Sequence, residues 1–264
     1  MDYLLACMKI IGDDTIQRTQ LKHRLQLVKA FDIKPGMRVL EIGCGQGDTT
    51  VALADAVGDT GKVVAIDIAS PNYGAPITLD EAAQTIQQSL IGKRIEFHFE
   101  TDFLIFNTTE HFDVIVLSHC SWYFKNPQQL LAYFKKMNTI TKRVCFAEWD
   151  MDYRELSQRP HFCAVNIQAL YSAYFGGDGN IQNVFHKAQI EEMLNEAKFT
   201  TTNKLIVDAT HLQDGDWEIA YAKELYTELL TAPQPIQTLA TTYAHLMNVD
   251  EHKSLNSFII VASA

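Results

Sequence analysis

The sequence is poor in cysteine and in basic residues. Its five cysteines include no C-x-x-C pair, which argues against a disulfide framework or a zinc site built from thiolates. Lysine and arginine number 22 against 32 aspartates and glutamates, so the 264-residue chain carries a net charge of −10. Nucleic-acid binding depends on lysine and arginine contacts with phosphates. We therefore expect no nucleic-acid partner.

Long hydrophobic runs are absent as well. The longest, at 114–117 and 258–262, fall far below the roughly 18 apolar residues that a membrane-spanning helix requires. Residues 1–3 lack the cationic region of a secretory signal peptide. Together with the unpaired cysteines, these features favour a cytoplasmic protein without stable membrane association. A hydrophobic fraction of 47% still predicts a folded chain with a sizeable core.

Two common catalytic patterns are missing. No H-E-x-x-H pattern or other close cluster of His, Cys and Asp indicates a metal site. No G-x-S-x-G sequence marks the nucleophile turn of a hydrolase. We therefore expect no bound metal.

What the sequence does contain is an alternation of short apolar runs with helical patterns. Strands are expected at 38–42, 62–67, 95–99, 112–118, 143–147, 200–207 and 257–262. Helices are expected over parts of 21–31, 51–57, 78–90, 126–137 and 190–197, with a capping box at Thr78–Glu81 and an N-cap at Asn126. Strands that alternate with helices predict crossover connections and a mostly parallel sheet.

The alternation changes after Glu148. Residues 150–185 are rich in aromatic side chains and contain the glycine-rich loop 176–180. Further helical segments flank Pro233 and Pro235. We predict a helical segment over 1–35 that acts as a lid, followed by one α/β domain over 36–264 with helical insertions near 150–185 and 210–250.

The most informative segment is 39–48, in which a β-branched run meets three glycines at alternate positions, VLEIGCGQGD. Glycines let a ligand approach the backbone, and the helix that follows offers free N–H groups to an anion. A dinucleotide fingerprint requires a glycine where Asp48 stands, which disfavours a nicotinamide dehydrogenase. A phosphate-binding P-loop requires a lysine that is absent. An acid, Glu41, followed by G-x-G-x-G is what remains.

This pattern resembles motif I of class I S-adenosylmethionine-dependent methyltransferases, and three further segments match that family in order. Residues 63–67 (VVAID) resemble the second strand with its terminal acid, 101–103 (TDF) the segment after the third strand, and 112–116 (FDVIV) the fourth strand. The likeness covers roughly residues 36–147. It implies an enzyme with S-adenosylmethionine as cofactor and a Rossmann-like methyltransferase fold. That fold is α/β, with a seven-stranded mostly parallel sheet, helices on both faces and a helical insertion or cap.

The resemblance also implies a set of cofactor-binding residues. Asp67 would accept hydrogen bonds from both ribose hydroxyls and Asp102 from the adenine amine, while Ile68 and Phe103 would flank the adenine. A strand-end cap remains the alternative for Glu41, and a turn carboxylate for Asp67. The full set is Glu41, Gly43, Cys44, Gly45, Gly47, Asp67, Ile68, Asp102, Phe103 and Ser118.

Catalytic residues are harder to identify, because methyl transfer needs alignment more than acid–base chemistry. His119 follows the fourth strand and is the first candidate base; a histidine packed at a strand end is the alternative. Tyr73 is a second candidate, or a solvent-exposed loop residue. Trp122, Tyr123 and Trp149 are candidate substrate contacts, with aromatic core and a strand end as the competing interpretations.

Two details qualify the likeness. Many members of the family carry Glu-Ala-Gly-Phe at the end of the fifth helix, whereas this chain has Lys198 in the glycine position, which weakens a helix cap. Segments 15–18, 67–76 and 122–124 further resemble a bacterial group described as cyclopropane-fatty-acyl-phospholipid-synthase-like. True cyclopropane synthases are longer chains with an additional N-terminal lipid-binding region. The acidic composition of this chain also does not suit binding to anionic bilayers.

We therefore expect in-line methyl transfer to a small apolar or aromatic molecule. Two alternatives stay open. One is methylene transfer to unsaturated acyl chains, and the other is a cofactor-binding protein without turnover. The substrate, the acceptor atom and the oligomeric state do not follow from the sequence.

Overall fold

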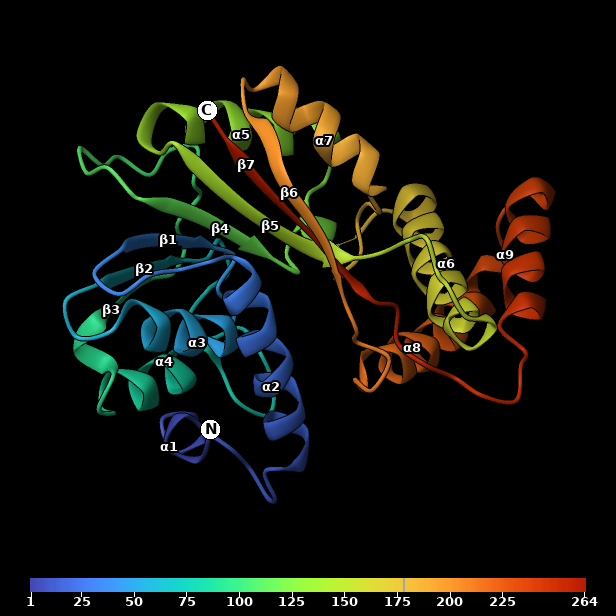
Figure 1. Ribbon diagram of the computed structural model, residues 1–264. Helices are drawn as coiled ribbons and strands as arrows, with labels where there is room; N and C mark the ends of the chain where they lie inside the picture. Colours follow the sequence, from blue (N-terminus) through green and yellow to red (C-terminus); the bar gives the residue numbers. More distant parts are fainter. Residues whose placement is uncertain (178) are drawn as a thin grey trace.

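The computed structural model describes residues 1–177 and 179–264. Its centre is a seven-stranded sheet in the order β3-β2-β1-β4-β5-β7-β6 (Figure 1). The first five strands are parallel, while β7 runs antiparallel to both of its neighbours. The strands are β1 (Arg38–Ile42), β2 (Lys62–Ile66), β3 (Ile95–His98), β4 (Val114–Ser118), β5 (Arg143–Trp149), β6 (Thr200–Val207) and β7 (Ser257–Ser263).

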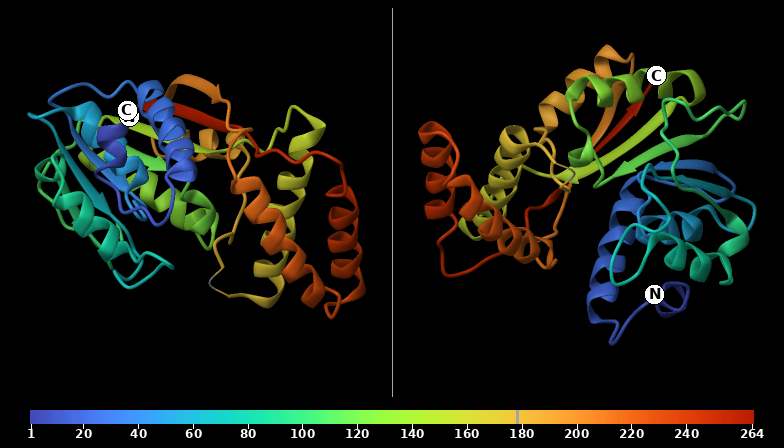
Figure 2. Two further views of the ribbon diagram at one scale, coloured as in Figure 1. Left: turned by 90° about the horizontal axis from the view of Figure 1, so that it is seen from below. Right: turned by 180° about the vertical axis from the view of Figure 1, so that it is seen from behind.

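Helices cover both faces of this sheet. One face carries α5 (Pro127–Ile140) and α7 (Lys187–Glu196), and the other carries α2 (Thr15–Ala30), α3 (Asp48–Val57) and α4 (Leu79–Gln87) (Figures 1 and 2). The short α1 (Asp2–Leu5) lies near α2 and α3. This arrangement confirms the predicted α/β fold with a mostly parallel sheet.

Alternate residues of the strands build two separate cores. Leu40, Ile42 and Ile115 point to the core under α5 and α7. Val39 and Val114 point to the other core, under α2 and α3. Two cores form because successive strand side chains face opposite sides, and β1 and β4 carry apolar residues on both faces, with Arg38, Glu41 and Ser118 as their polar positions.

A lobe of three helices extends beyond the sheet. It consists of α6 (Arg159–Phe175), α8 (Asp214–Leu229) and α9 (Gln234–Leu246), which share a small apolar core around Ile167, Ala222 and Ala240. Figure 2 shows the lobe set apart from the sheet and joined to it through the ends of β5, β6 and β7. We call this lobe the cap. Its helices lie within the two segments for which the sequence predicts insertions, and Asp178 of the predicted loop lies outside the described residues.

Local expectations mostly agree with the structure. Thr78 and Glu81 form the predicted capping box, with nitrogen–oxygen distances of 3.2 and 3.1 Å, and Asn126 Oδ1 accepts from the Gln129 amide at 2.9 Å. The helical pattern at 78–90 includes Leu90, but α4 ends at Gln87 and Leu90 is 60% exposed. The first and last residues of the strands differ from the expected ones by at most two positions.

The end of α7 is a Schellman turn with lysine in the glycine position. The amides of Lys198 and Phe199 donate to the carbonyls of Asn195 and Leu194 at 3.0 and 2.9 Å, and Lys198 has a φ of +69°. A lysine pays a steric cost in this left-handed region that glycine does not.

We expect Lys198→Gly to raise the free energy of unfolding by about 0.5–1 kcal/mol. Chemical denaturation of the parent protein and of Lys198→Gly measures this difference in the free energy of unfolding. Lys204→Gly, in strand β6 with ordinary strand geometry, is the control and should lose stability. A loss of stability in Lys198→Gly would contradict the assignment of strain to this turn.

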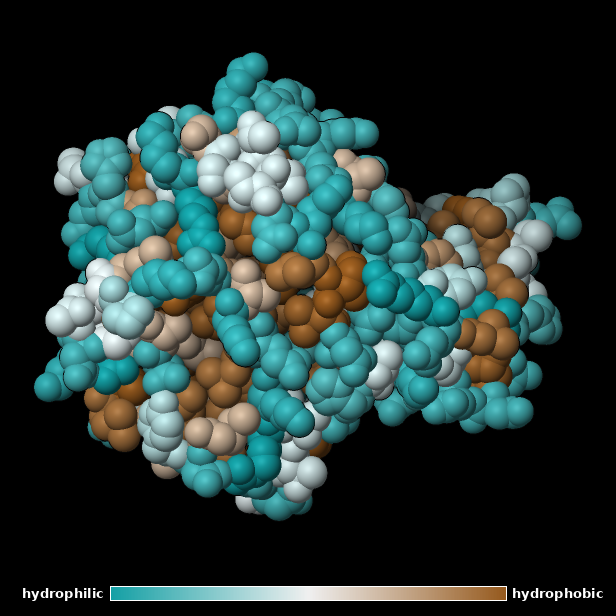
Figure 3. Space-filling model, in the orientation of Figure 1, coloured by the Kyte–Doolittle hydropathy of each residue, from teal (hydrophilic) through white to brown (hydrophobic). Residues whose placement is uncertain are grey.

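The surface is mostly hydrophilic on the face shown in Figure 3, with smaller apolar areas at the centre and on the cap. Among the described residues, no helix has the length and apolar character to span a membrane.

Candidate active site

The glycine segment connects β1 to α3 through a tight turn. Gly43, Gly45 and Gly47 have φ values of +77°, +52° and +90°, which side chains rarely adopt. A Cβ on Gly43 would lie 2.6 Å from the Cys120 Cβ, and one on Gly47 would lie 2.7 Å from Ile86 Cδ1. A Cβ on Gly45 would meet no atom within 4 Å. Packing against the Cys120 Cβ therefore requires a glycine at position 43, the left-handed conformation favours one at position 47, and Gly45 borders open space.

Asp67 directly follows β2 and fixes the turn. Its Oδ2 accepts from the Gly45 amide at 2.8 Å, and its Oδ1 accepts from the Ala69 amide at 2.9 Å. A carboxylate oxygen has two lone pairs, so each oxygen retains capacity for a further donor. The acid at the end of β2 is thus oriented toward the open side of Gly45.

A cavity of about 480 Å³ lies next to these groups, at the carboxyl ends of β1, β2 and β4. This is the edge at which open α/β sheets bind ligands, and the volume suits a small molecule. We call it the site cavity. Its lining is largely apolar and aromatic and includes Gly43, Gly45, Asp67, Ile68, Tyr73, Phe103, His119, Cys120, Tyr123, Phe124, Lys125, Gln129 and Tyr133.

Asp102 and Phe103 sit at one wall of the site cavity. Asp102 Oδ1 accepts from the Tyr133 hydroxyl at 2.7 Å and from the Leu104 amide at 2.9 Å. The rings of Phe103 and Tyr133 pack 5.2 Å apart. Phe103 and Tyr133 line the cavity, while Asp102 lies beside them and positions the tyrosine hydroxyl.

His119 lies at the end of β4 with a left-handed φ of +52°. Its Nδ1 accepts from Arg24 Nη1 at 2.8 Å, because a guanidinium only donates. The remaining hydrogen is then on Nε2, which donates to Ser257 Oγ at 2.9 Å. Burial, and after it the charge of Arg24, lowers the pKa of His119 well below its usual range. The imidazole is therefore neutral, and both ring nitrogens are engaged.

Arg24 and Ser257 were not predicted from the sequence. Arg24 lies on α2 and Ser257 begins β7, so they reach His119 from distant parts of the chain. Ser257 Oγ also lies 3.0 Å from His23 Nε2. Only the polar character of residues on the buried face of α2 signals this contact in the sequence.

Two buried carboxyl groups stand behind the site cavity. Glu41 accepts from the Thr50 hydroxyl at 2.5 Å, and burial raises its pKa to about 8. Glu148 accepts from the Ser121 amide and hydroxyl at 3.0 and 2.8 Å, and burial raises its pKa to about 7. Neither side chain lines the cavity. Both acids therefore support the loops that surround it.

The predicted site residues thus divide into two groups. Those brought together around the site cavity are Gly43, Gly45, Asp67, Ile68, Tyr73, Phe103, His119 and Tyr123. Those behind its lining are Glu41, Cys44, Gly47, Asp102, Ser118, Trp122 and Trp149. Trp122 and Trp149 differ most from expectation, since they are only 5% and 6% exposed and belong to the hydrophobic core. Among the described residues, no cluster of three potential metal ligands occurs.

The cavity fits the cofactor that the sequence resemblance implies. Gly45 leaves space where a side chain would stand, and Asp67 has free acceptor capacity for hydroxyl groups. Ile68, 62% exposed, and Phe103 provide apolar surface on the same wall.

Comparisons with known proteins agree with this geometry. A family model described as a methyltransferase domain matches residues 33–198. A crystal structure of a cyclopropane-fatty-acyl-phospholipid synthase-like protein from Lactobacillus casei is 35% identical, with a TM-score of 0.93, and the match covers 100% of this chain and 98% of that one.

Two relatives with named activities match over shorter regions. Methyltransferase phomM from Diaporthe leptostromiformis is 28% identical over 52% of this chain and 41% of its own length. A demethylmenaquinone methyltransferase from Bacillus cereus is 38% identical over 29% of this chain and 33% of its own. The match therefore spans less than half of either relative. The family match, the sheet order and the glycine turn together establish that the chain belongs to the class I S-adenosylmethionine-dependent methyltransferases.

Proposed function

We propose that this methyltransferase acts on a small molecule whose apolar or aromatic part lies against Tyr73 and Tyr123 in the site cavity. The proposal is carried by one observation: these tyrosines and His119 share a single, mostly apolar cavity with Gly45 and Asp67. Tyr73 and Tyr123 are 54% and 53% exposed, so their rings are accessible to a ligand. Aromatic faces bind apolar groups and stabilise nearby positive charge.

The chain's own residues would bind and orient the reactants. When bound, S-adenosylmethionine supplies an activated methyl group, so the protein's main task is alignment and exclusion of water. We propose that the backbone at Gly43–Gly47 holds its amino-acid portion, Asp67 its ribose hydroxyls, and Ile68 and Phe103 its adenine. We also propose that residues 1–35 close over the site, since Arg24 on α2 already contacts His119.

His119 and Tyr73 remain the candidate catalytic residues, with different roles. The lone pair on His119 Nδ1 accepts a hydrogen bond from Arg24, so His119 would take a proton there only after that hydrogen bond is broken. We therefore propose that it orients the acceptor. Tyr73 Oη donates to Asn180 Oδ1 at 3.3 Å and would hold the acceptor from the loop side.

Titration calorimetry with S-adenosylmethionine and S-adenosylhomocysteine is the first test, followed by mass spectrometry of a panel of small aromatic and apolar acceptors. We expect both cofactor forms to bind and at least one acceptor to gain a methyl group. Tight cofactor binding without product across the panel would favour a protein without turnover. No binding of either cofactor form would refute the proposal.

The glycine turn offers a test that separates binding from folding. We expect Gly45→Ala to fold, at a cost of about 1–2 kcal/mol for alanine in a left-handed conformation, and to bind S-adenosylhomocysteine at least ~10-fold more weakly. Gly43→Ala should instead lose about 3 kcal/mol of stability through its clash with Cys120. Calorimetry and thermal melting measure the pair, and unchanged binding by Gly45→Ala would contradict the role of this turn.

Methylene transfer to unsaturated acyl chains is the second candidate, favoured by the name of the Lactobacillus casei relative. Incubation with unsaturated phospholipid would give an adduct one methylene heavier. The net charge of −10 supports the small-molecule proposal, because anionic lipid surfaces attract basic proteins. We further propose a cytoplasmic protein that binds neither nucleic acid nor membranes stably.

A further inference from the structure

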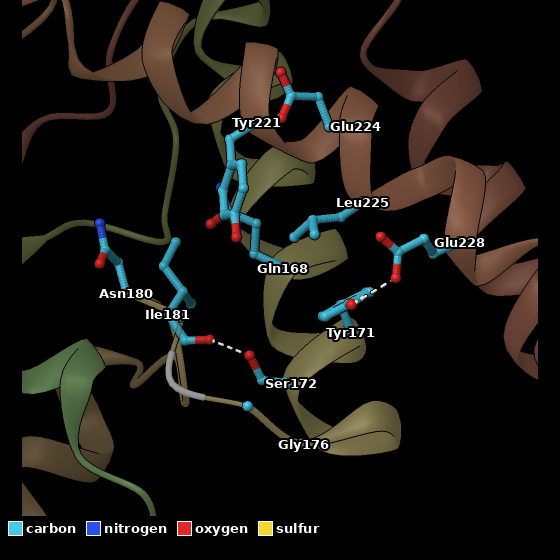
Figure 4. Close-up of a pocket in the computed structure, with 12 residues that line it drawn as sticks. Gln168, Tyr171, Ser172, Gly176, Asn180, Ile181, Tyr221, Glu224, Leu225 and Glu228 are labelled. Carbon is cyan, nitrogen blue, oxygen red and sulfur yellow. Dashed lines mark hydrogen bonds between the residues drawn. The ribbon is translucent and has the colours of Figure 1, made fainter.

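We infer that a second cavity, inside the cap, binds the cationic end of the methyl acceptor, so that the acceptor is an amine. This inference rests on the proposed function, because it names the class of substrate for the same site. The cavity lies between α6 and α8. We call it the cap pocket and define it by Gln168, Tyr171, Ile181, Tyr221, Glu224 and Glu228 (Figure 4).

The cap pocket is large enough for part of a small molecule. Its volume is about 350 Å³, at the lower end of the range for ligand sites. Figure 4 shows side chains of α6 and α8 around the pocket opposite Ile181, with Glu228 directed to Tyr171 and Glu224 at the upper edge. Its residues are distinct from those of the site cavity.

The charge of the cap pocket is of one sign. Glu224 and Glu228 line it, and no lysine or arginine does so among the residues that the structure describes. The Tyr171 hydroxyl donates to Glu228 at 2.7 Å, which leaves the negative charge of this carboxylate in place. Tyr171 and Tyr221 add aromatic faces. Carboxylates and tyrosine rings together are the groups that attract an ammonium ion.

Gln168 supplies an independent indication of a ligand. The residue is only 2% exposed, and its Nε2 donates to the carboxylate and the carbonyl of Glu218. Both partners are acceptors, so this orientation of the amide is fixed and Oε1 is left free. Within the described residues Oε1 has no hydrogen-bond partner. A buried acceptor without a partner is costly, and an N–H donor from a ligand would satisfy it.

The cap pocket is connected to the site cavity by direct contact. Tyr73 lines the site cavity, Asn180 lines the cap pocket, and the two side chains are hydrogen-bonded at 3.3 Å. The inferred acceptor spans these neighbouring cavities, with its aromatic part at Tyr123 and its ammonium group in the cap pocket.

Three compounds with the same ring and different ends test the inference. Tyramine has an ammonium end, 4-ethylphenol a neutral end and 3-(4-hydroxyphenyl)propionate a carboxylate end. Each is titrated calorimetrically, with and without saturating S-adenosylhomocysteine. We expect tyramine to bind about 10-fold more tightly than 4-ethylphenol, and the carboxylate to bind most weakly.

A charge-neutral variant assigns the preference to this pocket. Glu224→Gln combined with Glu228→Gln should remove most of the preference for tyramine, a change of about 10-fold, and thermal melting verifies folding. Glu192→Gln, exposed on α7 outside both cavities, is the matched control and should leave the preference intact.

The outcomes separate this inference from the proposed function. Equal binding of the three compounds, binding of none, or a preference that survives in the double variant would overturn the inference. Failure of S-adenosylhomocysteine to bind would refute the proposed function instead, while the titrations without it still decide whether the cap pocket selects amines.

Discussion

Replacing Asp67 with alanine is expected to lower the affinity for S-adenosylmethionine about 100- to 1,000-fold. The carboxylate would accept two charge-assisted hydrogen bonds from the ribose, each worth about 1.5–3 kcal/mol. It also holds the amides of Gly45 and Ala69, so its loss releases the turn that borders the cofactor. Titration calorimetry with S-adenosylhomocysteine measures the change directly.

Two further variants make this result specific. Asp67→Asn keeps the size and one acceptor oxygen but loses the charge. Its affinity for S-adenosylhomocysteine should lie between those of Asp67→Ala and the parent protein. Asp59→Ala removes an exposed acid that precedes β2, at the opposite end of the strand, and should bind as the parent does. If Asp67→Ala bound with unchanged affinity, the ribose role would be wrong.

The second large effect concerns Glu41 and pH. Its pKa is about 8 in the folded protein against an ordinary 4.5, so the folded state favours the neutral carboxyl. Protonated Glu41 therefore adds to the free energy of unfolding. This contribution, up to about 5 kcal/mol, is fully present below pH 4.5 and is lost as pH rises through 8, at about 1.4 kcal/mol per pH unit. Glu41→Gln carries no titrating proton and should remove this slope. Urea denaturation at closely spaced pH values measures it.

The interval from pH 7 to 8 isolates this carboxyl. Glu148 has a pKa of about 7 and loses most of its effect below that interval. His23 and His161 have pKa values lowered to about 3 by burial, so their contribution is complete above pH 6.5. Glu148→Gln should therefore leave the slope between pH 7 and 8 in place. A slope unchanged in Glu41→Gln would show that another group titrates there.

The part of the site cavity around the glycine turn was predictable because its signals are local. Gly43, Gly45 and Asp67 stand at strand ends, and the spacing of a strand, a turn and a helix fixes where they meet. The strands themselves are visible because parallel strands buried on both faces are continuously apolar.

The surroundings of His119 were not predictable, because its contacts join distant segments. Arg24 and Ser257 meet at His119 only when α2 and β7 have both packed against the end of β4. Trp122 and Trp149 were expected at the site but lie in the hydrophobic core, because an aromatic residue near a strand end can pack in the core as readily as it can contact a ligand. Local sequence carries no information that separates these cases.

The position of β7 has a consequence for synthesis on the ribosome. This strand lies between β5 and β6 and brings Ser257 to His119, yet it follows every other element of the fold in the chain. During translation β5 and β6 therefore emerge before the strand that separates them. Until residues 257–263 leave the exit tunnel, β5 lacks one neighbouring strand, β6 lacks its only one, and His119 lacks its hydrogen bond to Ser257. The enzyme completes its seven-stranded sheet and the environment of His119 in the same step.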